Sequence, residues 1–307
     1  MEKQETPQSG RGKYDLPLGS AAGGLSFSAT VLINLLISII ASAVISLSSL
    51  KDTDAAKYIS MLISPVAIAV TLALALKVAK QPARAILPVK THPKYFLIGV
   101  LLIFGLLFSL NSVNEYLIQL FELMGYQRRE NILPDISGWK IAPALLVIAV
   151  LPAVMEEILF RGMLLNNAEE GAGTVRAIFL SGLCFSLYHG SVEQTIYQFI
   201  CGCLFAFLAV RARSLAPTVL IHFINNAIII VLSACGLFDE SGALIMSETV
   251  EIIVSIFSAV SLIGAVVWLI LDKKELKKCQ SGGVKLFFLF ASVGIGATAL
   301  MWIIGLF

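Results

Sequence analysis

Two adjacent glutamates and an arginine interrupt an otherwise apolar stretch of the chain. Glu156, Glu157 and Arg161 lie within residues 144–162, among Leu, Ile, Val, Phe and Ala. A charged side chain at the centre of a membrane-spanning helix costs about 2.5 to 3.5 kcal/mol, so three of them cancel the segment's preference for lipid. We therefore expect all three to face a protein interior or a water-filled cavity, where ionisable groups usually serve a function.

The spacing of these residues predicts different roles for the two glutamates. Glu157 and Arg161 are four residues apart on one helical face, so an ion pair can keep Glu157 ionised. Glu156 points about 100° away and lacks that partner. Two carboxylates in unlike environments can divide acid and base roles between them. The alternative, a purely architectural Glu–Arg pair, explains Glu157 and Arg161 but leaves Glu156 unexplained.

Two of the three histidines also lie in apolar segments. His189 ends the run Phe185-Ser-Leu-Tyr-His189, and His222 shares a helical face with Asn226 in His222-Phe-Ile-Asn-Asn226. His92 stands beside Pro93 in a basic loop and is expected to be solvated. A lone histidine in an apolar helix is usually a structural group. Two of them, together with a glutamate pair and a co-facial asparagine, indicate one polar site.

The composition places these residues in a membrane protein. Of the 307 residues, 58% are hydrophobic and 14% are charged, and the mean hydropathy is +0.89. These values exclude an ordinary soluble domain and a disordered chain. The 22 Lys and Arg against 20 Asp and Glu, without a dense basic stretch, exclude nucleic acid as a partner. The five cysteines are odd in number and lack metal-binding or redox spacing, so we interpret them as small buried residues.

Apolar runs long enough to cross a bilayer repeat along the chain. They predict an all-α, polytopic helical membrane protein of about nine transmembrane helices. An N-terminus on the inside places every Lys and Arg in inner segments except Lys51, Lys57, Arg128, Arg129 and Lys140. The predicted spans are 27–49, 58–76, 95–113, 141–164, 175–190, 192–210, 216–236, 250–271 and 286–306.

At its polar residues the sequence resembles the CAAX protease and bacteriocin-processing (CPBP or Abi) family of intramembrane endopeptidases, including type II CAAX prenyl endopeptidases. The family pattern is Glu-Glu-x-x-x-Arg, then Phe-x-x-x-His, then His-x-x-x-Asn or Asp. The three motifs are complete and in order, as Glu156-Glu157-Ile-Leu-Phe-Arg161, Phe185-Ser-Leu-Tyr-His189 and His222-Phe-Ile-Asn-Asn226. Each motif alone is weak, but the set is specific.

This resemblance implies a function and a role for each residue. Glu156 and His189 would hold and activate a water that attacks a peptide carbonyl, and His222 and Asn226 would stabilise the oxyanion. Glu157 and Arg161 would support the site. The implied partners are the lipid bilayer and a membrane-associated or lipidated protein or peptide. The chain would be a multi-pass protein, of the cell membrane if prokaryotic, and no sequence signal specifies an oligomeric state.

The metal requirement stays open at the level of sequence. Glu156, His189 and His222 would make a two-His, one-Glu zinc site with an open position for water, and the family is commonly classed with metalloproteases. The chain has no His-Glu-x-x-His motif, however, and a metal-free glutamate mechanism is equally compatible with these residues. A transporter with a buried ion path and a non-catalytic immunity or scaffold protein are the alternative functions.

Composition, the apolar runs and the positions of the three motifs together suggest how the chain is divided. Residues 1–26 would be a polar N-terminal tail, and 27–140 the first transmembrane helices with an outer amphipathic connector over 114–140. Residues 141–236 would be the catalytic core, and 237–307 a C-terminal helix pair. Straight vertical helices would not bring Glu156, His189 and His222 together, so we expect tilted or short helices and a cavity that opens to the cytoplasmic side. Pro152, Gly182 and Pro217 offer places for bends.

Overall fold

The computed structural model describes residues 19–79, 90–128, 133–238 and 244–306. Those residues form helices and contain no strand beyond one isolated bridge between Phe238 and Leu244. The predicted all-α class is therefore confirmed. The α-helices are α1 (Gly19–Ser46), α2 (Asp54–Ala79), α3 (Lys94–Ser109), α4 (Asn111–Leu123), α5 (Ile141–Ala144), α6 (Leu151–Glu157), α7 (Asn166–Ala172), α8 (Thr174–His189), α9 (Thr195–Ala212), α10 (Ala216–Ala234), α11 (Glu248–Leu271) and α12 (Gly283–Leu306).

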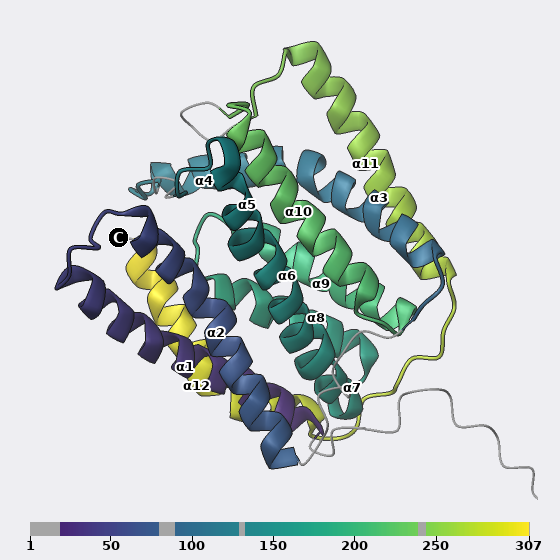
Figure 1. Ribbon diagram of the computed structural model, residues 1–307. Helices are drawn as coiled ribbons and strands as arrows, with labels where there is room; N and C mark the ends of the chain where they lie inside the picture. The colour runs from purple at the N-terminus through teal and green to yellow at the C-terminus, as the bar shows by residue number, and fades with distance from the viewer. Residues whose placement is uncertain (1–18, 80–89, 129–132, 239–243, 307) are drawn as a thin grey trace, which may run out of the picture.

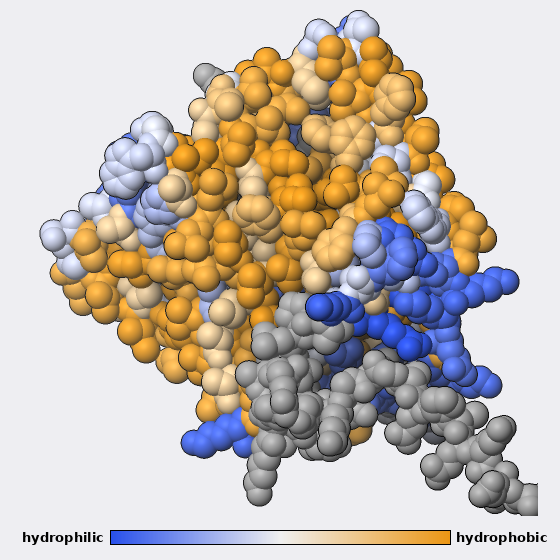
Figure 2. Space-filling view, turned by 45° about the vertical axis from the view of Figure 1, so that its right-hand side comes forward, coloured by the Kyte–Doolittle hydropathy of each residue, from blue (hydrophilic) through white to orange (hydrophobic). Residues whose placement is uncertain are grey.

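Within the described residues, eight helical segments are long and apolar enough to cross a membrane. They coincide with eight of the nine predicted spans. The predicted fifth span is α8, whose 16 residues extend about 24 Å and fall short of a bilayer core of about 30 Å. Large apolar side chains are exposed along these helices, including Ile39 at 67% and Leu289 at 68%. Apolar residues cover most of the face in Figure 2, as expected for a surface that contacts lipid.

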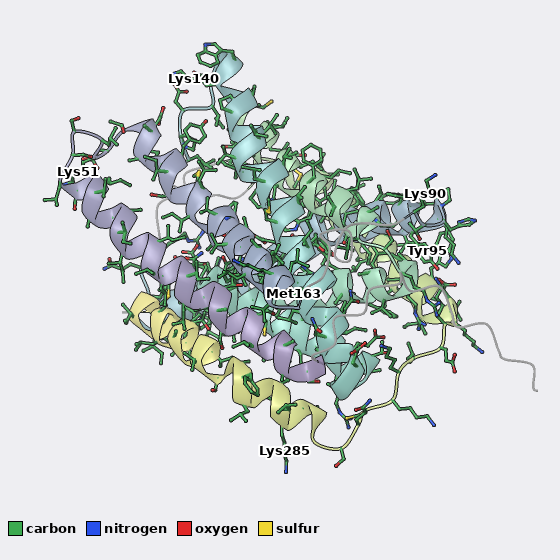
Figure 3. The ribbon with its side chains drawn as sticks, turned by 60° about the horizontal axis from the view of Figure 1, so that its bottom comes forward. Lys51, Lys90, Tyr95, Lys140, Met163 and Lys285 are labelled. Carbon is green, nitrogen blue, oxygen red and sulfur yellow. The ribbon has the colours of Figure 1, made fainter. Side chains whose placement is uncertain are left out.

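Basic side chains gather at the two ends of the helices. Lys51 and Lys140, from predicted outer segments, lie toward one end in Figure 3, and Lys90 and Lys285, from predicted inner segments, lie toward the other. This separation agrees with the predicted topology. Which end is cytoplasmic stays a prediction.

The helices form three groups (Figure 1). Helices α1, α2 and α12 pack side by side, and α3 packs along α11 on the opposite side. The central segment from α5 to α10 lies between these groups. One apolar cluster, which includes Phe27, Phe160, Phe185 and Phe287, joins the first group to the centre, and a second, which includes Ile98, Phe205 and Leu269, joins the centre to α3 and α11. The central segment is therefore packed from both sides.

The predicted fourth span is an irregular helix. It runs from a 3-10 turn, η2 (Gly138–Lys140), through α5, the π-helix η3 (Leu145–Val150), α6, a second π-helix η4 (Ile158–Leu165) and α7. Pro152 lies in the first turn of α6 and has no N–H to donate to the carbonyl of Ile148, four residues earlier. The Asn226 side-chain amide of α10 donates to that carbonyl instead, at 3.2 Å. The irregularity thus ties the fourth span to α10.

Small residues bring α1 and α12 into close contact. A Cβ atom at Gly24 would clash with the Phe287 carbonyl and lie 2.9 Å from the Ala291 backbone nitrogen. Ser28 donates to the Phe290 carbonyl at 2.7 Å and accepts from the Gly294 N–H at 3.0 Å. Small residues and interhelical hydrogen bonds of this kind drive helix association in lipid.

We predict that Gly24→Ala lowers the thermal unfolding midpoint by about 2 to 10 °C, because overpacking costs about 1 to 3 kcal/mol. Gly296→Ala on α12 is the matched control, since a Cβ atom there meets nothing within 4 Å. Unfolding of both variants in the same detergent measures the difference. Equal midpoints would contradict the close α1–α12 contact.

Candidate active site

The three sequence motifs meet at Glu156. The Oε2 atom of Glu156 on α6 lies 3.9 Å from Nε2 of His189 and 3.9 Å from Nε2 of His222. These two histidines come from the end of α8 and from α10. All three side chains are largely buried, with His189 the most exposed at 22%. The structure therefore brings together the residues that the sequence predicts to act on water.

The path of α8 explains how His189 reaches this depth. Helix α8 packs antiparallel along the fourth span, with the Phe160 and Phe185 rings 5.2 Å apart and the Ser181 hydroxyl donating to the Phe160 carbonyl. Its last residue then lies level with Glu156. Gly190, with a left-handed φ of 57°, ends the helix directly after His189.

Only one of the three predicted bends lies at an irregularity. Pro152 stands where η3 passes into α6, as predicted. Pro217 instead occupies the first turn of α10, where a proline needs no bend. Gly182 lies inside a continuous α8, and a Cβ atom there would meet the Cys203 backbone nitrogen of α9 at 2.9 Å. Gly182 and Pro217 therefore serve close packing and helix initiation, and it is the short α8 of 16 residues that ends with His189 beside Glu156.

The second glutamate is held in a fully buried ion pair. Oε1 of Glu157 accepts a hydrogen bond from Nη1 of Arg161 at 2.8 Å, and neither side chain is exposed. Nδ1 of His222 lies 3.0 Å from the same oxygen. Glu157 therefore connects the arginine to the histidine that faces Glu156.

Aromatic rings and a backbone carbonyl surround Arg161. Its guanidinium carbon lies 4.4 Å from the Phe185 ring centroid and 5.4 Å from that of Phe205. Nη2 donates to the Gly202 carbonyl at 3.2 Å. Guanidinium groups stack well on aromatic faces, so these contacts fix the orientation of the arginine. The motif residue Phe185 thus contacts the arginine, and its ring lies 4.7 Å from that of His189.

Hydrogen bonds at the far nitrogens orient both histidines. Nδ1 of His189 lies 2.8 Å from the Phe185 carbonyl, which can only accept, so Nδ1 carries the proton. Nδ1 of His222 likewise faces an acceptor, the carboxylate of Glu157. In the neutral form each ring then presents the lone pair of Nε2 toward Glu156.

A polar cavity of about 60 Å³ lies in front of Glu156. Oε2 of Glu156 is buried and has no hydrogen-bond partner among the described residues. The cavity is large enough for water and offers a carboxylate and two imidazoles as partners. Its lining comprises Glu156, Phe185, His189, Tyr197, Gln198, Cys201, Phe205, His222, Asn225 and Asn226.

Two of these lining residues extend the predicted site. Asn225 donates from Nδ2 to Oδ1 of Asn226 at 3.0 Å, and Tyr197 on α9 donates to Oδ1 of Asn225 at 3.5 Å. Asn226 keeps a second amide hydrogen beyond the one given to Ile148. Asn225 is adjacent to Asn226 in an apolar helix and could have been selected on that signal. Tyr197 comes from a segment without a motif, so only the packing identifies it.

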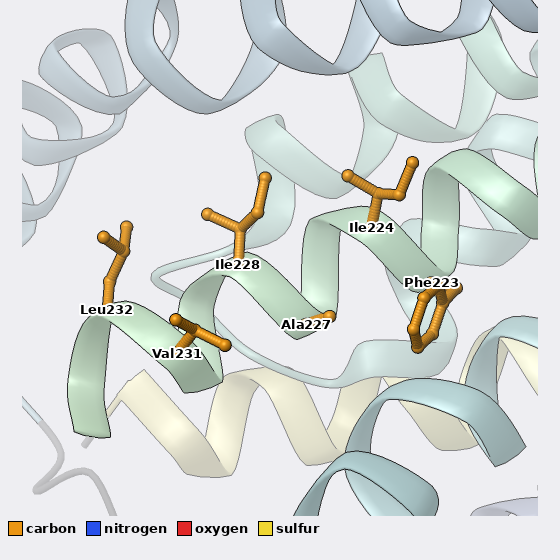
Figure 4. Close-up of a pocket in the computed structure, with 6 residues that line it drawn as sticks. All are labelled: Phe223, Ile224, Ala227, Ile228, Val231 and Leu232. Carbon is orange, nitrogen blue, oxygen red and sulfur yellow. The ribbon is translucent and has the colours of Figure 1, made fainter. Parts of the chain in front are cut away.

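An apolar groove of about 300 Å³ follows α10 beyond the polar cavity (Figure 4). Its six lining residues are Phe223, Ile224, Ala227, Ile228, Val231 and Leu232, all from α10. Ala227 directly follows Asn226, which lines the polar cavity. A single helix therefore carries the polar residues His222, Asn225 and Asn226 and an apolar groove that begins at the same level and continues to Leu232.

Comparison with known proteins shows what this core is similar to. Residues 138–228 match the family model described as Type II CAAX prenyl endopeptidase Rce1-like. This range contains all three motifs and the four residues around the cavity that the sequence predicts to be catalytic. The core of this chain is therefore similar to type II CAAX prenyl endopeptidases, in agreement with the resemblance that the three motifs carry.

A curated relative supports the same assignment. The membrane-embedded CAAX protease MroQ of Staphylococcus aureus (strain USA300) is 27% identical over 194 residues, which cover 60% of this chain and 76% of the relative. No solved structure matches the chain. At the level of the family, the chain is a multi-pass membrane protein with the core of an intramembrane protease.

The family's zinc ligands would be Glu156, His189 and His222. Ligand atoms around a tetrahedral zinc with bonds of 2.0 to 2.1 Å stand roughly 3.3 to 3.4 Å apart. Here the carboxylate oxygen is 3.9 Å from each ring nitrogen, and no group of three or more His, Cys, Asp or Glu side chains in the described ranges is arranged to hold a metal. The donor atoms as placed are too widely spaced for zinc.

We predict that Arg161→Met strongly destabilises the protein, by about 3 to 5 kcal/mol, because Glu157 would remain as a buried charge without its partner. The double variant Glu157→Gln/Arg161→Met removes both charges and should recover part of that loss. Thermal unfolding in detergent compares the two. A double variant less stable than the single variant would contradict the ion pair as the source of the effect.

Proposed function

We propose that the chain is an intramembrane endopeptidase that hydrolyses a peptide bond of a membrane-associated protein or peptide. The observation that carries this proposal is Oε2 of Glu156, which has no hydrogen-bond partner in the part of the chain that the structure describes and faces a cavity between two histidine nitrogens. A buried carboxylate and an imidazole within reach of the same water are what general base catalysis requires.

In the proposed reaction, Glu156 and His189 hold the water and Glu156 takes its proton. The water oxygen attacks the peptide carbonyl carbon, and the carbonyl oxygen becomes an oxyanion. The proton then passes to the amide nitrogen as the carbon–nitrogen bond breaks. Because the Glu156 and His222 side chains are largely buried, each of these electrostatic interactions is stronger than it would be in solution.

The oxyanion would be stabilised by His222 and Asn226. The remaining amide hydrogen of Asn226 can donate to it. A donor at Nε2 of His222 requires a proton on that nitrogen in addition to the one on Nδ1, which makes the ring a cation beside the carboxylate of Glu157. Arg161 balances the negative charge of Glu157. The His222 cation would lie between the carboxylates of Glu157 and Glu156 and pair with both. Preorganised donors of this kind typically contribute 10²- to 10³-fold to the rate.

The groove along α10 suggests how a substrate lies. An apolar segment placed over Ile224, Ile228 and Leu232 would extend from the level of Asn226 along the helix (Figure 4). The peptide bond next to that segment would then be near the polar cavity. The groove therefore favours a substrate with an apolar or lipidated part, as expected for a membrane-associated protein.

Glu156→Gln or His189→Ala should reduce cleavage of a membrane-anchored peptide by at least 10²-fold, because each removes a group that activates water. His92→Ala is the matched control, since His92 is exposed and distant in sequence from the motifs. Cleavage by purified protein in proteoliposomes, with unfolding midpoints measured alongside, separates lost chemistry from lost folding.

Full activity of both variants would reject the assigned site. Proton or ion flux into the same proteoliposomes, lost in Glu156→Gln without any cleavage by the wild type, would favour a transporter. A wild-type protein with neither cleavage nor flux would favour a non-catalytic scaffold.

We predict that cleavage survives removal of metal, because the three donor atoms are spaced too widely for zinc. The measurement pairs a peptide cleavage assay on protein stripped with a chelator with elemental analysis of the same sample. Loss of activity that returns with about one equivalent of zinc per chain would contradict the metal-free form of the mechanism while leaving the site residues in place.

A further inference from the structure

A cluster of basic side chains lies at the ends of three helices, away from the cavity. Lys94 is the first residue of α3, Arg211 lies in the last turn of α9, Arg213 follows that helix, and Lys274 stands three residues beyond α11. We call these four residues the basic cluster. The three helices pack against one another. Figure 3 labels Tyr95 and Lys90 at this edge of the molecule, and Figure 2 shows hydrophilic side chains gathered beside an apolar surface.

Contacts around Tyr95 hold the cluster together. The Nζ atoms of Lys94 and Lys274 lie 4.9 Å and 4.8 Å from the centroid of the same Tyr95 ring. Nη1 of Arg211 donates to the Lys274 carbonyl at 3.3 Å, and Nζ of Lys274 donates to the Arg211 carbonyl. The loop after α11 is thereby fixed to the end of α9.

Positive charge in the cluster exceeds negative charge. Asp272 accepts from Nζ of Lys94 at 2.9 Å and from the Tyr95 hydroxyl at 2.6 Å. Among the described residues, Arg211, Arg213 and Lys274 have no ion pair, and the other carboxylate of this loop, Glu275, is exposed. Burial lowers the pKa of Lys274, as do the charges of Arg213, Lys94 and Arg211, although Asp272 opposes the shift. The positive charges of the basic cluster therefore repel one another.

Arg211 is the unusual member of the cluster. It is only 6% exposed, and its Nε atom is buried without a hydrogen-bond partner in the described structure. A buried guanidinium without a counter-ion is costly. The tendency of basic residues to remain on the inner side of a membrane explains exposed residues such as Lys273 and Lys278, but it does not explain an arginine that is nine-tenths buried.

We infer that the basic cluster binds the phosphate-bearing headgroup of an anionic phospholipid. The guanidinium fork of Arg211 matches phosphate oxygens, and the ammonium of Lys274 adds charge beside it. The cluster stands where two apolar spans begin or end, next to exposed Leu97 (53%) and Leu271 (67%), which give acyl chains a surface to contact. Basic pockets between helices at the membrane interface bind lipid headgroups in this way.

The test uses the full chain in an uncharged detergent and three probes at matched concentration, namely dioctanoyl-phosphatidylglycerol, dioctanoyl-phosphatidylcholine and inorganic phosphate. Phosphatidylglycerol should raise the unfolding midpoint of the wild type by about 5 °C or more at saturation, because a ligand stabilises the state that it binds. The rise should fall by at least half in Arg213→Gln/Lys274→Gln.

Lys278→Gln/Lys285→Gln is the matched control, because it removes the same charge at exposed positions outside the cluster. It should keep the full response to phosphatidylglycerol. Arg213→Gln alone, at an exposed position, provides a second site variant if the double variant does not fold. An equal rise in the site and control variants, or an equal rise with phosphatidylcholine, would overturn the proposal. The same rise with inorganic phosphate would overturn the lipid as the source of the anion.

Discussion

The buried pair of Glu157 and Arg161 is the interaction on which the rest of the site depends. Because neither side chain contacts solvent, each charge requires the other, and the geometry around them is narrowly constrained. Arg161 also donates a hydrogen bond to the Gly202 carbonyl of α9, and its guanidinium lies over the Phe185 ring of α8. Glu157 contacts His222 of α10. One ion pair therefore fixes the relative positions of four helical segments, and Glu156, the next residue along the chain, is positioned by the same contacts.

The irregular fourth span adds a second constraint of the same kind. Two π-helices flank the glutamates, and Pro152 leaves the Ile148 carbonyl without the donor that a regular helix would supply at that position. Asn226 donates to that carbonyl and is itself oriented by it, and backbone carbonyls in a membrane require donors within the protein. The proposed oxyanion donor is thus placed by a backbone defect in the neighbouring helix. The side-chain amide of Asn226 therefore bonds to the fourth span and is also the proposed donor to the oxyanion.

Much of this arrangement could be predicted from sequence because charge is scarce in an apolar chain. The Glu157–Arg161 pair follows from a four-residue spacing within one helix, and eight of the spans follow from hydropathy alone. The roles of Gly182 and Pro217 could not be predicted, because a single residue type does not distinguish a bend from close packing or a helix start. Tyr197 and Phe205 could not be predicted, since both lie in α9 without a motif and reach the cavity only through tertiary packing. The domain boundaries and the cytoplasmic opening stay predictions.

The molecule places uncompensated charge of opposite sign at two depths. At the cavity, Arg161 balances Glu157, and an ionised Glu156 with a neutral His222 would add a negative charge whose Oε2 has no hydrogen-bond partner among the described residues. At the helix ends, Asp272 balances Lys94 while the buried Arg211 has no ion pair within the described ranges, so the basic cluster has an excess of positive charge. Neither excess is stable in an apolar surrounding without something that binds it. A proton or a water molecule can bind to the carboxylate of Glu156, and a phosphate anion can bind to the basic cluster. Buried charge therefore underlies both the proposed catalytic site and the proposed lipid site.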